Sequence, residues 1–212
     1  MNKILATISL FALFFATTFA NYDYDEMVDS ANNLAERSVV TDRSENPSEY
    51  NLDNNVLRQE IGLIAMRVAG LQKKSTCSGI FTDVTATAPN DWACVHLEPL
   101  VEKELISRNE MFRPEDNITK AESLKMLIKA IGYDFEYDSS SSVSWQEQYV
   151  DFAVEHDIIE VFTDYNTLAT RGWVFVVAAH TIETKEEEDK KEDDETYSDE
   201  AMMEIENLLE LF

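Results

Sequence analysis

Three basic residues, Arg58, Lys120 and Arg171, each stand where a helical pattern begins. The first turn of a helix has backbone N–H groups without intrahelical acceptors and carries the positive end of the helix dipole. A cation there can help to hold the carboxylate or ketal-acid group of a sugar. Trp92 and Trp145 offer flat apolar faces for a sugar ring. Together these residue types predict binding of an acidic glycan.

Each of these residues also has a plain structural interpretation, and the sequence leaves the choice open. The three cations could be solvated surface charges, and the two tryptophans could belong to the core. Thr119 and Glu122 have the spacing of a capping box, in which the hydroxyl accepts from first-turn amides and the carboxylate reaches back. Thr170 is the corresponding cap of the last helix. Asp83 could cap the helix that follows it or contact a ligand.

Patterns typical of enzymes are missing from the chain. It has no nucleophile elbow, no glycine-rich phosphate loop and no His-Glu-x-x-His motif. The histidines (His96, His156 and His180) are scattered, so a histidine metal site is not expected. Glycosidase-like carboxylate pairs could arise among so many acidic residues, but caps and solvated helix faces account for them. We therefore expect a non-enzyme with no metal and no cofactor.

Composition limits the partners and the fold class. The 212 residues include 42 Asp and Glu against 17 Lys and Arg, for a net charge of −25. Phosphate binding needs clustered cations, so nucleic acid is excluded as a partner and an anionic membrane face is disfavoured. The hydrophobic content of 44% is enough for a core, and 5 glycines with 4 prolines favour helices.

Internal repetition sets the predicted fold. A shift of 53 residues places Trp92–Ile106 on Trp145–Ile159, and both segments are amphipathic and end in paired aliphatic residues. A weaker copy lies at Glu26–Val40. Each copy is followed by a polar loop and a second helix, and one such hairpin cannot bury its apolar faces alone. We predict an all-α fold of three helix-loop-helix units around a shared pseudo-three-fold core, at residues 21–71, 72–133 and 134–183.

The middle unit carries a series of landmarks in a fixed order. They are Phe81-x-Asp83-Val84, Trp92, Leu105-Ile106, Phe112-Arg113-Pro114 and Ile118-Thr119-Lys120-Ala121-Glu122. This pattern resembles the S-layer homology domain. The outer units resemble it less closely, because the third lacks the Phe-x-Asp-Val opening and the first lacks both the threonine and the tryptophan.

The resemblance implies non-catalytic attachment to the cell envelope. Members of the family form a three-fold arrangement of units, with grooves at the starts of the signature helices that hold anionic secondary cell-wall polysaccharide or a peptidoglycan-linked glycan. Arg58, Lys120 and Arg171 occupy the basic signature positions. Lys120 replaces an arginine, and a lysine is a point charge rather than a bidentate fork. With one full signature in the chain, fewer than three working grooves are expected.

The charge distribution singles out the middle unit. Residues 72–133 carry 8 basic and 9 acidic side chains, whereas residues 134–183 carry 1 and 10. An anionic polymer is repelled least by the near-neutral unit. We therefore predict a groove centred on Lys120, with Lys125, Trp92 and a neighbouring unit contributing. Unchanged low-salt pull-down of wall material by a Lys120→Ala variant would contradict this prediction.

The N-terminus and the cysteines indicate export. Residues 1–20 combine Lys3, an apolar run and a small residue before the expected cut, which is typical of a signal peptide; a retained membrane anchor is the alternative. No later segment is apolar enough to span a membrane, so we expect an exported protein of the cell envelope or cell surface. In an oxidising compartment Cys77 and Cys94 are expected to form a disulfide, with two buried thiols as the alternative.

The acidic C-terminal segment supports an alternative function, the binding of a protein partner. Residues 184–200 form an acidic linker or a frayed helix extension, and residues 201–212 form a short amphipathic helix that could dock on the core or on a partner. The alternative to glycan binding is an exported surface scaffold or adaptor that binds protein through the degenerate units and this acidic tail. Removal of anionic substituents from wall material would abolish the first activity and spare the second.

Overall fold

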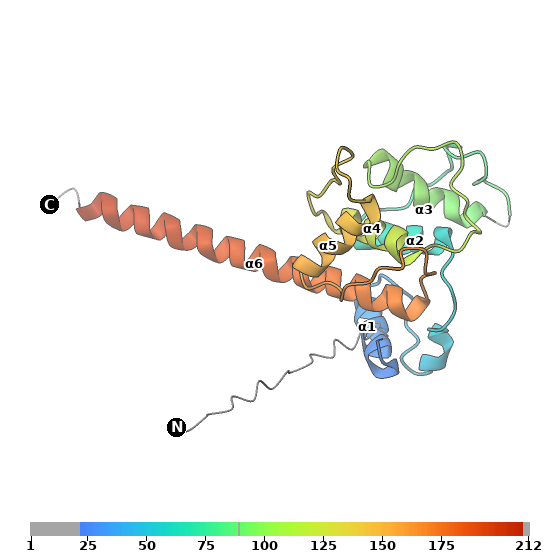
Figure 1. Cartoon of the computed structure of the whole chain (residues 1–212), viewed down its shortest axis with the longest axis horizontal. Helices are drawn as coiled ribbons and strands as arrows, with labels where there is room; N and C mark the ends of the chain where they lie inside the picture. The colour runs from blue at the N-terminus through green and yellow to red at the C-terminus, as the bar shows by residue number, and fades with distance from the viewer. Residues whose placement is uncertain (1–21, 89, 210–212) are drawn as a thin grey trace, which may run out of the picture.

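Helices are the regular secondary structure of the part of the chain that the structure describes, and loops join them (Figure 1). The computed structural model describes residues 22–88 and 90–209, with side chains described through residue 192; the predicted signal peptide, residues 1–20, lies outside these ranges. Backbone pairing within them is limited to isolated bridges, so the predicted all-α class is confirmed. The elements are α1 (Tyr24–Glu36), the 3₁₀ helix η1 (Pro47–Tyr50), α2 (Arg58–Val68), α3 (Asp91–Glu102), α4 (Lys120–Ile131), α5 (Trp145–Glu155) and α6 (Arg171–Leu209).

Side-chain caps set where several helices begin. Thr119 Oγ1 accepts from the backbone N–H of Glu122 at 3.2 Å, and Glu122 reaches back to the N–H of Thr119, which is the capping box that the sequence predicts. Ser144 caps α5 in the same way through its hydroxyl. Gly132 ends α4 with φ of 97°, a left-handed conformation that costs glycine little. The sequence therefore places these helix boundaries through local chemistry.

A closed ring of backbone hydrogen bonds joins the segments that precede α2, α4 and α6. The N–H of Val56 donates to Ala169 O at 2.9 Å, the N–H of Ala169 to Ile118 O at 2.9 Å, and the N–H of Ile118 to Val56 O at 3.0 Å. All three residues are buried. The ring therefore brings the starts of the three helices to one place in the molecule.

The helices pair differently from the predicted hairpins. Within the predicted middle unit α3 was expected to pack on α4, but α3 packs on α2, α5 packs on α4, and α1 packs on α6. Glycine makes two of these contacts close: a β-carbon on Gly62 would overlap the side chain of Leu97, and one on Gly172 would overlap Met27. Each first helix of a predicted unit thus covers a second helix of another unit.

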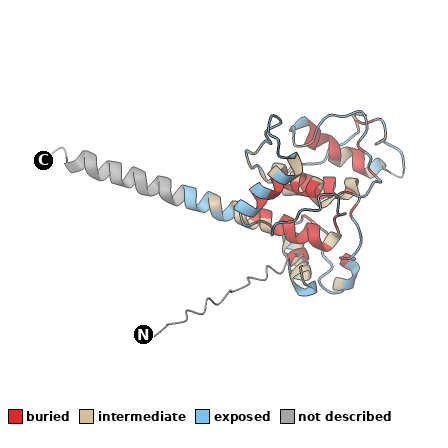
Figure 2. Cartoon of the chain, viewed as in Figure 1, coloured by how far each residue is buried: buried red, intermediate tan, exposed pale blue. Residues whose placement is uncertain are grey.

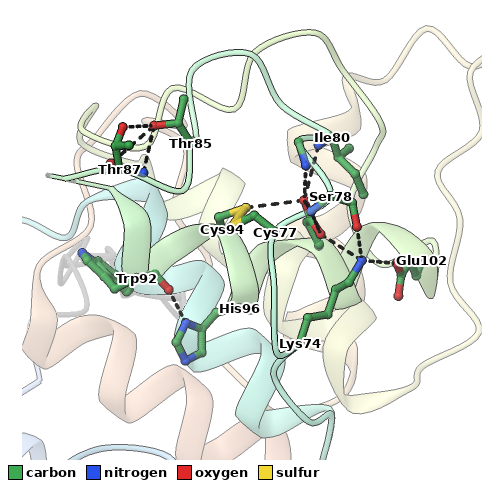
Figure 3. The surroundings of a disulfide bond; sticks show 12 residues. Lys74, Cys77, Ser78, Ile80, Thr85, Thr87, Trp92, Cys94, His96 and Glu102 are labelled. Atoms are coloured by element: carbon green, nitrogen blue, oxygen red, sulfur yellow. Dashed lines mark hydrogen bonds and ion pairs between the residues drawn. A yellow bond between two sulfur atoms is a disulfide. The ribbon is translucent and has the colours of Figure 1, made fainter.

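The segment before α3 is fastened by the disulfide drawn in Figure 3 and by a buried carboxylate. Cys77 and Cys94 are joined, so the predicted disulfide is confirmed. Glu98 is 1% exposed; it accepts from the N–H groups of Ser78 and Gly79 at 2.7 and 2.8 Å and pairs with the Lys74 ammonium at 2.9 Å. A chain segment without secondary structure is thereby held against α3.

Helix α6 starts in the core and continues beyond the body of the molecule (Figure 1). Its first turns are buried and its later described turns are exposed (Figure 2). Arg37 and His156 bind Glu186 and Glu188 near the point where α6 leaves the body. The predicted linker, residues 184–200, therefore continues the same helix, which extends into the predicted segment 201–212 as far as Leu209. Among the described residues, no helix is long and apolar enough to cross a membrane.

Glu98 makes stability depend on pH in a defined direction. Burial favours its neutral form, but the Lys74 ammonium and the backbone N–H groups outweigh burial and lower the pKa from 4.5 to about 2. Since the folded pKa lies below the unfolded value, ionised Glu98 stabilises the fold above about pH 4.5, and this contribution is lost as pH falls towards about 2. In thermal melts, Glu98→Gln should lower Tm strongly at neutral pH. Near pH 2, where Glu98 becomes protonated, it should lower Tm only slightly. The exposed neighbour Glu102, replaced by Gln, is the control; equal Tm losses for both variants would contradict this account.

Candidate functional site

Two of the predicted basic residues join one helix start to the next. Arg58, at the start of α2, donates from Nε to Phe112 O at 2.9 Å and from Nη1 to Glu122 Oε1 at 2.9 Å. Arg171, at the start of α6, donates from Nε to Tyr50 O at 2.8 Å and from Nη1 to Glu60 Oε1 at 3.2 Å. Both guanidinium groups are thus already bound by carboxylates of the same chain.

Lys120, the third basic residue, has a different partner. Its ammonium lies 5.3 Å from the ring centroid of Trp173. Trp173 is the third residue of α6; the third residue of α4 is Glu122 and that of α2 is Glu60. No ion pair joins it to a carboxylate among the described side chains, and burial lowers its pKa. The contact between the starts of α4 and α6 is therefore a cation–π contact, whereas the other two pairs of helix starts are joined by an arginine–carboxylate pair.

Two cavities lie beside the arginine–glutamate junctions. The first, here called the α4–α5 cavity, has a volume of about 420 Å³ and is lined by Arg58, Glu104, Leu105, Ile106, Ser107, Asn109, Met111, Phe112, Glu122, Lys125, Met126, Lys129, Glu136, Tyr137 and Trp145. The second, the α2–α6 cavity, has a volume of about 690 Å³ and is lined by Val40, Thr41, Arg43, Glu49, Tyr50, Asn51, Asn54, Asn55, Leu57, Glu60 and Arg171.

The cavities bring together only part of the predicted site. Arg58, Lys125 and Trp145 meet in the α4–α5 cavity, whereas Lys120 and Trp92 line neither cavity. Trp92 lies half-buried on α3 and packs against the core. The predicted grouping of Lys120, Lys125 and Trp92 in one groove is therefore not seen in either cavity.

Lys125 is the distinctive cation of the α4–α5 cavity. Its ammonium lies 5.0, 5.1 and 5.4 Å from the ring centroids of Tyr137, Trp145 and Tyr149. Burial lowers its pKa, and nearby Lys129 acts in the same direction. Such rings attract a cation through their quadrupole without neutralising its charge. Tyr137 and Tyr149 were not among the predicted site residues, although the density of aromatic residues between 133 and 152 was a usable signal.

The other charges of this cavity are mostly paired. Arg58 pairs with Glu122 at 2.9 Å and Lys129 with Glu136 at 2.5 Å. Lys125 forms no ion pair among the described side chains, and neither does Glu104, on the loop that follows α3. The cavity thus offers one cation held by aromatic rings and one acid, neither of which forms an ion pair among the described side chains.

The middle of the chain is similar to a known domain family. Residues 80–122 match the S-layer homology domain. The matched segment contains every landmark from Phe81 to Glu122, so the resemblance that the sequence indicated is confirmed there.

Two curated surface proteins are similar over a wider range. The middle cell wall protein of Brevibacillus brevis is 29% identical over 132 residues, which is 60% of this chain and 12% of that protein. The surface layer protein of Brevibacillus choshinensis is 23% identical over 88 residues, or 41% of this chain and 8% of that protein. The chain thus matches a small part of each relative. The domain match and these similarities indicate an exported protein of the cell surface, as predicted.

Within the S-layer homology segment, the conspicuous acids have structural partners. Asp83 accepts from the N–H groups of Phe112 and Arg113 at 2.8 and 2.7 Å, so it fastens the loop before α4 and does not cap α3. Glu122 caps α4 and also binds Arg58, and the Arg113 guanidinium lies 3.5 Å from the same carboxylate.

Thr170, at the start of α6, accepts from the N–H of Trp173 at 3.4 Å, which agrees with its predicted role as a cap.

The Arg58 junction should contribute measurably to stability. Replacing Arg58 with Ala removes two side-chain hydrogen bonds and leaves the partly buried Glu122 without this partner, so we expect a loss of about 2 kcal/mol in the free energy of unfolding. Arg43→Ala is the control, because Arg43 pairs with Glu49 in solvent and its loss should cost less than about 0.5 kcal/mol. Urea unfolding measures both; equal losses would show that the junction does not link the helices energetically.

Proposed function

We propose that the protein is a non-catalytic cell-envelope attachment module that binds an anionic wall polysaccharide through the α4–α5 cavity. The observation that carries this proposal is Lys125, a cation held among aromatic rings on a cavity wall and free of an ion pair in the described part of the chain. The S-layer homology match and the two cell-wall and surface-layer relatives support an attachment role. The polymer is a secondary cell-wall polysaccharide or a peptidoglycan-linked glycan.

The cavity suits an acidic sugar in three ways. Lys125 supplies a charge for a carboxylate, and a charge-assisted contact of this kind is stronger than a neutral hydrogen bond. Trp145 and Tyr137 supply apolar faces against which a sugar ring can stack. Ser107 and Asn109 supply polar groups for its hydroxyls. The acidic group of the sugar would bind at Lys125, the cation of the cavity without an ion pair among the described side chains.

We infer that three S-layer homology units, at residues 21–71, 72–133 and 134–183, share the core. The closed ring at Val56, Ile118 and Ala169 supports this division, because each predicted unit contributes one residue to it. The repeated arginine–glutamate junctions support it as well. In this view Lys120 belongs to a structural junction with Trp173, and Lys125 takes the glycan-binding role that was predicted for Lys120.

A sedimentation assay with purified wall fractions tests the proposed site. Lys125→Ala should lower the affinity at low salt about tenfold, since a half-buried charge contact contributes about 1–2 kcal/mol. Lys103→Ala removes the same charge from an exposed position outside the cavity and should have little effect. Unchanged binding by Lys125→Ala, or a loss in Lys120→Ala alone, would contradict the proposed site.

Glu104 provides a test in the opposite direction. Glu104→Gln removes the unpaired acid of the cavity while keeping the side-chain size, so affinity for the anionic polymer should rise about two- to threefold at low salt. The gain should shrink as salt screens the repulsion. Glu155→Gln changes the net charge equally from an exposed site on α5 and serves as the control. An equal gain in both variants would assign the effect to overall charge.

A protein partner for the acidic tail is the second candidate. It is favoured by the continuation of α6 beyond the body of the molecule, in a segment rich in acidic residues (Figure 1). Deletion of residues 193–212 should abolish such an interaction and leave wall sedimentation intact. Loss of wall sedimentation on this deletion would instead connect the tail to attachment.

A further inference from the structure

The Cys77–Cys94 disulfide joins the segment before α3 to the start of α3 (Figure 3). Glu98 lies one helical turn after Cys94 and therefore on the same face of α3. Its carboxylate accepts from the N–H groups of Ser78 and Gly79, the two residues that follow Cys77. The disulfide and the carboxylate thus fix this stretch of chain to one face of the helix.

The residues that follow this fixed stretch hold the loop between α3 and α4. Thr82 donates from its N–H and from its hydroxyl to Glu110 O, at 2.9 and 3.0 Å. Asp83 accepts from the N–H groups of Phe112 and Arg113, at 2.8 and 2.7 Å. These hydrogen bonds tie the loop to the segment that the disulfide fixes.

The same loop forms one wall of the α4–α5 cavity. The residues that it contributes to the lining include Ser107, Asn109, Met111 and Phe112. Among the described residues, the hydrogen bonds of residues 107–111 to other segments all go to Thr82. The position of this wall therefore depends on the segment that follows Cys77.

We propose that the Cys77–Cys94 disulfide positions the loop wall of the α4–α5 cavity, so that binding of the anionic polysaccharide depends on the redox state of the two cysteines. This inference rests on the proposed function. The crosslink removes conformations in which the segment lies away from α3, and Thr82 and Asp83 extend this restriction to the loop. The oxidised chain holds the wall in place, whereas in the reduced chain the wall opens locally more often.

Reduction of the disulfide proceeds by thiol–disulfide exchange. A dithiol reductant such as dithiothreitol breaks the S–S bond; Cys77 and Cys94 each gain one electron and one proton, and the two reductant thiols form a disulfide. Disulfides persist in oxidising compartments and are rare in the cytosol. The chain therefore binds wall polysaccharide most tightly after export, once the two cysteines are oxidised.

Amide hydrogen exchange of the full chain tests the positioning without any ligand. After dithiothreitol treatment, the amides of Thr82, Phe112 and Arg113 should exchange at least about tenfold faster than in the oxidised chain. The amides of the closed backbone ring are the internal control and should keep their rates. Unchanged exchange at Phe112 and Arg113 would overturn the inference. Equal acceleration in the ring, or loss of helical circular dichroism, would show that the disulfide holds the whole fold and would also overturn it.

Sedimentation with purified wall fractions tests the consequence for binding. Dithiothreitol should lower the affinity of the wild type about fivefold, which corresponds to roughly 1 kcal/mol. The Cys77→Ser/Cys94→Ser variant should bind like the reduced wild type. It should not respond to dithiothreitol, which controls for an effect of the reagent on the wall material.

Asp83→Asn tests the route from the disulfide to the loop, because it keeps the disulfide and removes one of the two carboxylate acceptors. It should weaken binding in the oxidised chain. Combined with the two cysteine replacements, it should weaken binding by less than the sum of the separate losses, since both changes act through one segment. Fully additive losses would contradict this route and overturn the inference.

The outcomes separate this inference from the proposed function. Equal affinity of the oxidised and reduced chains, with a loss of affinity in Lys125→Ala, would overturn the inference and leave attachment through Lys125 standing. Failure of the oxidised wild type to bind wall fractions would overturn the proposed function. Faster exchange at Phe112 and Arg113 on reduction would in that case still support the positioning of the wall by the disulfide.

Discussion

The closed ring of backbone hydrogen bonds among Val56, Ile118 and Ala169 is the constraint on which the rest of the structure depends. These residues are buried, and a buried peptide group without a partner is costly. Each of the three residues hydrogen-bonds to the next through its backbone. The segments before α2, α4 and α6 therefore meet and cannot move apart independently. Because the helices start at this meeting point, a side chain in the first turn of one helix can reach the first turn of another.

Because the helix starts lie together, each capping glutamate binds both its own helix and an arginine of another helix. Glu122 caps α4 while it binds Arg58, and Glu60 accepts from the N–H of Leu57 while it binds Arg171. The first-turn arginines are consequently used to join helices. At the third junction a tryptophan replaces the glutamate, and a lysine above its ring replaces the arginine. All three signature cations therefore have structural partners within the described part of the chain.

Electrostatics explains how such an acidic chain could receive an acidic polymer. Long-range repulsion is weakest beside the near-neutral middle segment. At close range Lys125 rests on aromatic rings, which stabilise its charge without cancelling it, whereas a carboxylate partner would do both.

The sequence by itself determined the features that depend on neighbours along the chain: helical class, the Thr119–Glu122 capping box and the S-layer homology landmarks. It also predicted the disulfide, because two cysteines in an exported chain leave one pairing. Only the tertiary structure decided that α3 packs on α2, that Arg58 and Arg171 are occupied by glutamates, and that Lys125 meets Tyr137 and Trp145. The physical reason is that capping acts within one helical turn, whereas an ion pair or an aromatic contact depends on the distance between segments that lie far apart in the chain and are brought together by the buried ring.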